Sequence, residues 1–109
     1  MPRDEVEAAY FTLLRAREEL DGIRRYGEFL HAEARRLRRF RSEGDALADT
    51  VDPRLRRPLR HTDPLLAEAI KARLAVIGEE LAALPDREAA AEAFVTECEE
   101  EHVRLREGR

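Results

Sequence analysis

The sequence has no tryptophan, one cysteine, and no apolar run longer than a few residues. A single cysteine, Cys98, excludes an internal disulfide. The short apolar runs argue against a membrane-spanning helix, and residues 1–5 lack the apolar core of a signal peptide. We therefore expect a cytoplasmic protein, with Cys98 serving as a small buried hydrophobic residue.

Catalytic and nucleotide-binding motifs are also absent. The chain contains no nucleophile elbow, phosphate loop, zinc-finger spacing or dinucleotide fingerprint. Its single serine, Ser42, and its three histidines are dispersed, so no nucleophile is paired with a base. We expect neither enzymatic activity nor a cofactor.

What the sequence does contain is charge and helical periodicity. Of its 109 residues, 40% are charged and 43% are hydrophobic, a composition typical of all-α proteins with coiled-coil-like packing. Two apolar seams follow helical spacing. The first seam is Val6, Ala9, Leu13, Ala16, Leu20, Ile23, Gly27, Leu30, Ala34 and Leu37. The second seam is Leu66, Ile70, Leu74, Ile77, Leu81, Leu84, Ala91, Val95, Cys98, His102 and Leu105, interrupted by Glu88.

Start and stop signals divide these seams into helices. Gly44 is placed to end the first helix, and Thr62-Asp63-Pro64 has the cap and proline of a helix start. Pro85 then interrupts the second seam. We expect one domain over residues 1–109, with a helix over residues 3–43, a tip loop over 44–62, and helices over 63–84 and 86–106. The fold class is an all-α long helical hairpin or three-helix bundle.

Charge bears on the choice between these two arrangements. Residues 35–60 carry nine arginines against four acids, a balance of +5, whereas residues 86–101 carry seven acids against one arginine, a balance of −6. In a straight hairpin the acids would lie beside Asp4, Glu5 and Glu7. Folding the last helix back, or pairing two chains antiparallel, would place them beside the arginines instead.

A second apolar strip on the first helix predicts association. Phe11, Leu14, Phe29 and Ala32 lie away from the first seam, where a lone hairpin would leave them in water. Burying a phenylalanine or leucine contributes roughly 1.5–3 kcal/mol. We therefore expect a homodimer or a bound partner helix.

The expected tip loop is a second candidate contact with a protein partner. It combines apolar residues with arginines: Val51, Leu55, Leu59, Arg54, Arg56 and Arg57. The apolar residues could anchor in a partner protein, or they could fold under the tip and seal the end of the bundle.

Two Glu-x-x-His spacings raise the possibility of a metal-binding bundle. Glu28 precedes His31, and Glu99 precedes His102, a device that di-metal carboxylate bundles use. In a chain this rich in glutamate such a spacing also occurs by chance. The alternative to metal binding is therefore that His31 and His102 are solvated or take part in capping.

The arginine-rich segment 35–60 is also compatible with nucleic-acid binding, because guanidinium groups bind phosphates. The net charge of −4 and the absence of an aromatic residue at the tip oppose it. The hypothesis that the sequence favours is a non-enzymatic interaction or regulatory module, built on a dimeric helical hairpin with an unidentified protein partner. Metal binding and accessory nucleic-acid binding are its alternatives.

Overall fold

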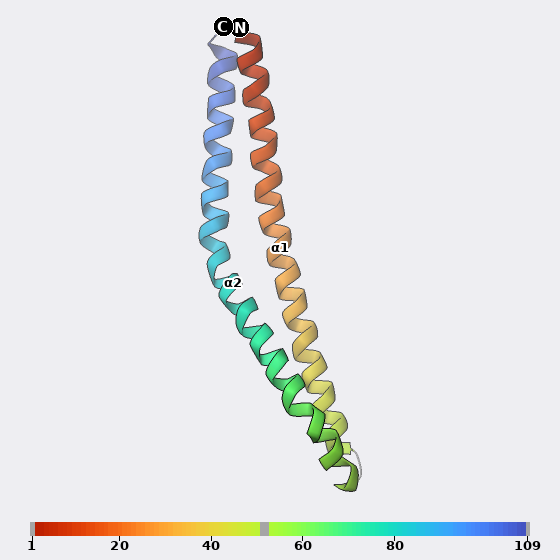
Figure 1. The fold of residues 1–109 in the computed structure, drawn as a ribbon. Helices are drawn as coiled ribbons and strands as arrows, with labels where there is room; N and C mark the ends of the chain where they lie inside the picture. Colours follow the sequence, from red (N-terminus) through yellow and green to blue (C-terminus); the bar gives the residue numbers. More distant parts are fainter. Residues whose placement is uncertain (1, 51–52, 109) are drawn as a thin grey trace. The chain divides into compact units, whose positions relative to one another are not determined.

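The computed structural model describes residues 2–50 and 53–108, and all of these except Gly108 lie in two α-helices. Helix α1 spans Pro2–Thr50 and helix α2 spans Pro53–Glu107 (Figure 1). The all-α prediction is confirmed, and the chain forms a helical hairpin. The alternative of a three-helix bundle is wrong, because α2 is one helix.

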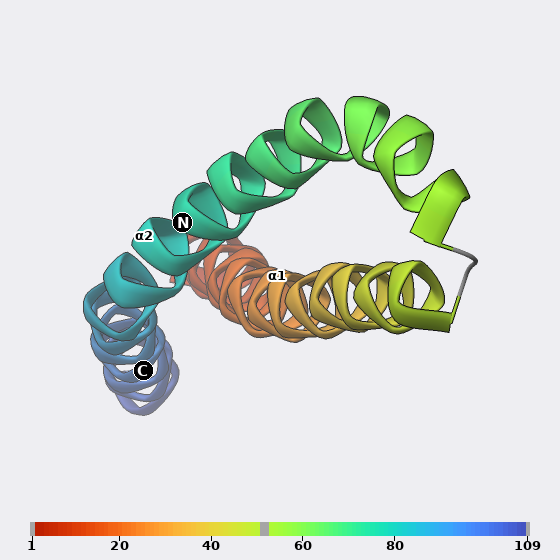
Figure 2. The same cartoon turned by 90° about the horizontal axis from the view of Figure 1, so that it is seen from below.

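The hairpin is divided into two compact units. The terminal unit comprises Met1–Gly27 and Ala83–Arg109, and the middle unit comprises Glu28–Ala82. Each unit therefore contains one segment of α1 and one of α2. Figure 2 shows the same two helices seen from below. The prediction of a single domain over residues 1–109 stays a prediction.

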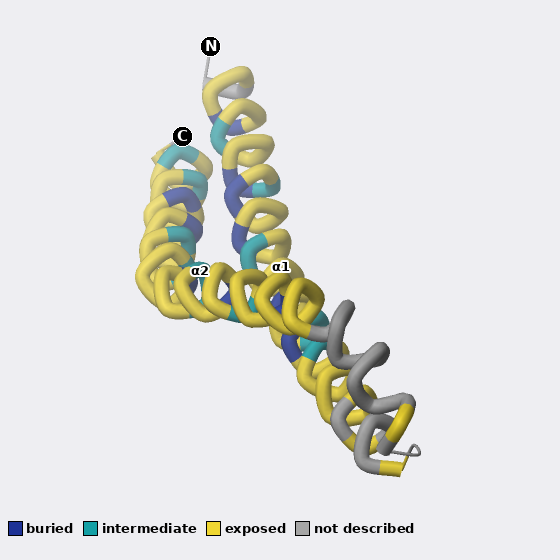
Figure 3. Tube along the Cα trace, turned by 60° about the horizontal axis from the view of Figure 1, so that its bottom comes forward, coloured by how far each residue is buried: buried dark blue, intermediate teal, exposed yellow. Residues whose placement is uncertain are grey.

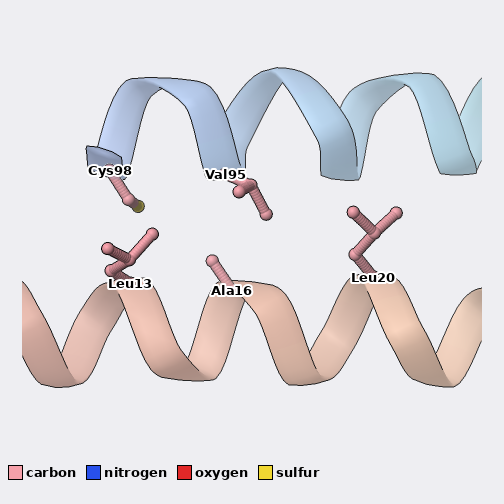
Figure 4. Packing of buried hydrophobic residues seen from close by; sticks show 5 residues of the cluster. All are labelled: Leu13, Ala16, Leu20, Val95 and Cys98. Atoms are coloured by element: carbon pink, nitrogen blue, oxygen red, sulfur yellow. The ribbon is translucent and has the colours of Figure 1, made fainter. Parts of the chain in front are cut away.

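The core of the terminal unit lies between antiparallel segments of α1 and α2. Leu13, Ala16 and Leu20 of α1 face Val95 and Cys98 of α2 (Figure 4). Each of these five side chains is buried, which confirms Cys98 as a small hydrophobic core residue. Such packing, rather than helix propensity, supplies most of the stability of long helices.

The middle unit has its own buried residues on both helices. Leu30 and Ala34 of α1 and Ile70 and Ile77 of α2 are buried, and Leu30 and Ile77 are fully enclosed. In both units the buried positions form a stripe along each helix (Figure 3). Every residue of the first seam is buried or half-buried, and Leu66 is the one exposed residue of the second seam.

The expected tip loop over residues 44–62 is largely helical instead. Helix α1 continues through Gly44 to Thr50, and α2 already begins at Pro53. A glycine ends a helix by adopting a positive φ, and no described glycine does so. Proline suits the first position of a helix, where its missing N–H costs nothing, and Pro53 occupies that position.

The expected break at Pro85 is also wrong, because α2 passes through this residue without interruption. A proline in a helix removes the hydrogen bond to the carbonyl four residues earlier, here that of Leu81. Leu84 and Val95, before and after the proline, are both buried in the terminal unit. Their packing holds the helical register despite the lost bond.

The acidic segment after Pro85 packs against the first half of α1, so the last part of the chain does not fold back. Arg24 Nε lies 2.9 Å from Glu88 Oε1, and Arg24 Nη2 lies 2.8 Å from Glu92 Oε1. Arg17 Nη2 lies 3.8 Å from Glu99 Oε1. Arg17 and Arg24 thus offset part of the acidic charge, which makes folding back unnecessary.

Candidate interaction surfaces

The outer side of α1 carries an exposed aromatic residue in the terminal unit. The side chain of Phe11 is 63% exposed, and its ring lies edge-on to Tyr10 with 5.9 Å between centroids. Beside it is a shallow hollow of about 290 Å³, lined by Phe11, Thr12, Leu14, Arg15 and Glu18. All of these residues belong to α1, so this surface is presented by one helix.

The predicted apolar strip continues in the middle unit. Phe29 is 51% exposed and Ala32 is half-buried, whereas Leu14 in the terminal unit is half-buried. Phe11 and Phe29 are thus exposed, as expected for residues outside the seam, whereas Leu14 and Ala32 are partly covered. Phe11 and Phe29 are the most exposed members of the strip.

A second hollow lies between α1 and α2 of the terminal unit, and sequence reasoning missed it. Its volume is about 770 Å³. Its lining consists of Glu5, Ala8, Ala9, Thr12, Phe94, Glu97, Cys98, Glu101, Arg104 and Leu105. We call it the acidic groove, because three carboxylates accompany an otherwise mainly apolar lining.

Side-chain size explains why a groove forms here. Ala8 and Thr12 lie one helical turn apart on α1, and neither reaches far toward α2. The Thr12 hydroxyl donates a hydrogen bond of 2.9 Å to the Ala8 carbonyl and is thereby satisfied within the helix. Tyr10 and His102, outside this lining, instead pack against each other with their rings tilted by 45° and 5.6 Å between centroids.

Charged pairs between the helices shift two pKa values. Hydrogen bonds to Glu88 and Glu92 raise the pKa of Arg24. In the middle unit, Arg73 donates two hydrogen bonds, of 2.8 and 3.0 Å, to the carboxylate of Glu33. These bonds lower the pKa of Glu33.

The four predicted metal ligands are divided between the two units. Glu28 and His31 lie in the middle unit and are exposed, whereas Glu99 and His102 lie in the terminal unit. Glu99 faces Arg17, and His102 is half-buried against Tyr10. Among the described residues, no three His, Cys, Asp or Glu side chains group as metal ligands do.

Most of the predicted partner-binding residues near the tip have side chains that lie outside the described part of the structure. Val51 lies outside the described residues, as do the side chains of Leu55, Arg56, Arg57 and Leu59. Arg54, close to the start of α2, is exposed. The contact predicted at the tip therefore stays a prediction.

Exposed arginines do gather on α1 in the middle unit. They are Arg35, Arg36, Arg38, Arg39 and Arg41, and Phe40 among them is 54% exposed. An exposed aromatic ring therefore accompanies the positive charge of this part of α1.

No described helix has an apolar stretch long enough to cross a membrane. No family model matches the sequence, and comparisons with curated proteins and with solved structures yield no match.

Proposed function

We propose that the chain is a non-enzymatic protein-interaction or regulatory module of the cytoplasm. Its helical hairpin associates through the outer side of α1, with a second copy of the chain as the first partner. The surface used comprises Phe11, Leu14 and Phe29.

The observation that carries this proposal is the exposure of Phe11 beside a shallow hollow that apolar and charged residues line together. Its ring is 63% exposed although the same helix buries Leu13 and Ala16 on its other side. Leu14, which also lines the hollow, offers apolar contact one helical turn from Phe11. A phenylalanine covered by a partner contributes roughly 1.5–3 kcal/mol.

A helical partner suits this surface better than a small molecule. The hollow is shallow and belongs to one helix, whereas small-molecule sites are usually concave and enclosed on several sides. Arg15 and Glu18, which also line it, can supply polar contacts around an apolar one. Helix-on-helix association uses such a stripe of apolar and flanking charged residues.

Sedimentation equilibrium of wild type and Phe11→Ser tests the proposal. We expect a wild-type dimer and, in Phe11→Ser, a dissociation constant raised at least about tenfold, since tenfold corresponds to 1.4 kcal/mol. Leu65→Ser is the matched control, because Leu65 is exposed and lies outside the strip. A monomeric wild type, or equal weakening by both variants, would refute association through this surface.

A further inference from the structure

The acidic groove combines an apolar lining with two carboxylates that form no ion pair within the described part of the chain. Phe94 in its lining is 45% exposed, and Ala8, Ala9 and Leu105 add further apolar surface. Of its three carboxylates, Glu101 is paired with Arg104, whereas Glu5 and Glu97 form no ion pair with another described residue. The groove therefore suits a helix that carries both an aromatic ring and positive charge.

The chain itself contains a helical surface of that chemistry in its middle unit. Phe29, Arg36 and Phe40 are spaced by seven and four residues, so they share one side of α1. Phe29 and Phe40 are each about half exposed, and Arg36 and its neighbour Arg39 are exposed. We call this surface the basic flank.

The dimensions of the two surfaces also agree. Phe94 and Leu105, at the ends of the groove on α2, are eleven residues apart, and so are Phe29 and Phe40. At 1.5 Å per residue both distances are about 16 Å. Glu97 and Glu101 are spaced by four residues and Arg36 and Arg39 by three, so each pair of like charges lies within about one helical turn.

We propose that the acidic groove of one chain receives the basic flank of a second copy. Because each chain carries both surfaces, a two-fold dimer would make the contact twice, as isologous interfaces do. Opposite charges would fix the antiparallel pairing, and the phenylalanines would supply apolar contact. This inference rests on the self-association proposed above; its basic flank shares Phe29 with that surface but includes neither Phe11 nor Leu14.

A charge-swap experiment tests the pairing directly. One full-length variant carries Glu97→Arg and Glu101→Arg, and the other carries Arg36→Glu and Arg39→Glu. Each variant alone would face like charge with like charge, and we expect its dimer dissociation constant to rise at least about tenfold. In an equimolar mixture both contacts are again between opposite charges, so a heterodimer should form.

Native mass spectrometry distinguishes the species, because the two variants differ in mass. Circular dichroism confirms that each variant is still helical. Glu100→Arg is the control on α2, since Glu100 is exposed and does not line the groove. We expect it to dimerise as the wild type does.

Each outcome has a definite meaning. Two weakened variants that recover as a heterodimer would support the pairing of groove and flank. Variants that dimerise like wild type, or that weaken but do not recover on mixing, would overturn this pairing and leave association through Phe11 standing. A monomeric wild type would refute self-association altogether.

Discussion

At the scale of single residues, Glu88 shows how a charged residue fits an apolar seam. It occupies the position in the second seam where the helical spacing calls for an apolar side chain, and it is half-buried. The Nε–H of Arg24, on α1, donates a hydrogen bond of 2.9 Å to the Glu88 carboxylate. The sequence shows that Glu88 interrupts the apolar seam. The arginine that pairs with it lies on the other helix and is identified only in the structure.

Two glycines in α1 give a matched test of packing in the terminal unit. A Cβ at Gly22 would meet no heavy atom within 4 Å, whereas a Cβ at Gly27 would lie 3.3 Å from Leu84 Cδ1. Glycine within a helix costs about 0.5–1 kcal/mol relative to alanine. Gly22→Ala should therefore stabilise the protein by about that amount, measured by urea unfolding at fixed protein concentration.

Gly27→Ala should give a smaller gain than Gly22→Ala, because the buried Leu84 must shift to admit the methyl group. An equal or larger gain from Gly27→Ala would contradict the close approach of the two helices at this position.

The pair of Glu33 and Arg73 predicts a pH dependence. Hydrogen bonds from Arg73 lower the pKa of Glu33 in the folded chain. A carboxyl group with a lowered folded-state pKa stabilises the fold above its unfolded-state pKa, and this contribution is lost as the pH falls through the folded-state pKa. Glu33→Gln should therefore reduce stability at neutral pH and approach wild type in acid.

Urea unfolding of wild type and Glu33→Gln from neutral pH to about pH 3 measures this difference. Glu68→Gln is the control in the same unit, since Glu68 forms no ion pair with a described residue. A stability difference between Glu33→Gln and wild type that is independent of pH would count against the pairing with Arg73.

At the scale of elements, periodicity predicted the buried faces better than the ends of the helices. The first seam is buried or half-buried throughout, because apolar spacing reports directly which side of a helix meets another. The predicted end of the first helix, at residue 43, is too early because Gly44 resembles a helix stop. The pair Asp52-Pro53 has the same start signature as Asp63-Pro64, so the earlier start of α2 was visible in the sequence.

Pro85 offers a direct test of the continuity of α2. An interior proline costs about 3 kcal/mol relative to alanine, whereas a proline in the first turn costs little. Since α2 runs through Pro85, Pro85→Ala should stabilise the protein by about 1–3 kcal/mol, measured by urea unfolding.

Pro53→Ala is the control for this prediction, because Pro53 is the first residue of α2 and should tolerate the change with little effect. If Pro85→Ala were neutral or destabilising, Pro85 would instead begin a separate helix.

At the scale of the whole molecule, the sequence predicted association but not the acidic groove. The opposite charge balances of residues 35–60 and 86–101 suggested that the acids after Pro85 pair with the arginines of residues 35–60. Their actual partners, Arg17 and Arg24, lie far from them in the sequence and come near Glu99, Glu88 and Glu92 only when the helices pair. The small residues Ala8 and Thr12 were a visible signal, but their role depends on what α2 places opposite.

The central claim is that this hairpin works by associating through α1, and its mass in solution tests that claim most directly. Sedimentation equilibrium at moderate ionic strength should give twice the chain mass of 12.6 kDa for wild type and a shift toward 12.6 kDa for Phe11→Ser. The Leu65→Ser control should remain dimeric. A wild type that sediments at 12.6 kDa across the concentration range would contradict the claim.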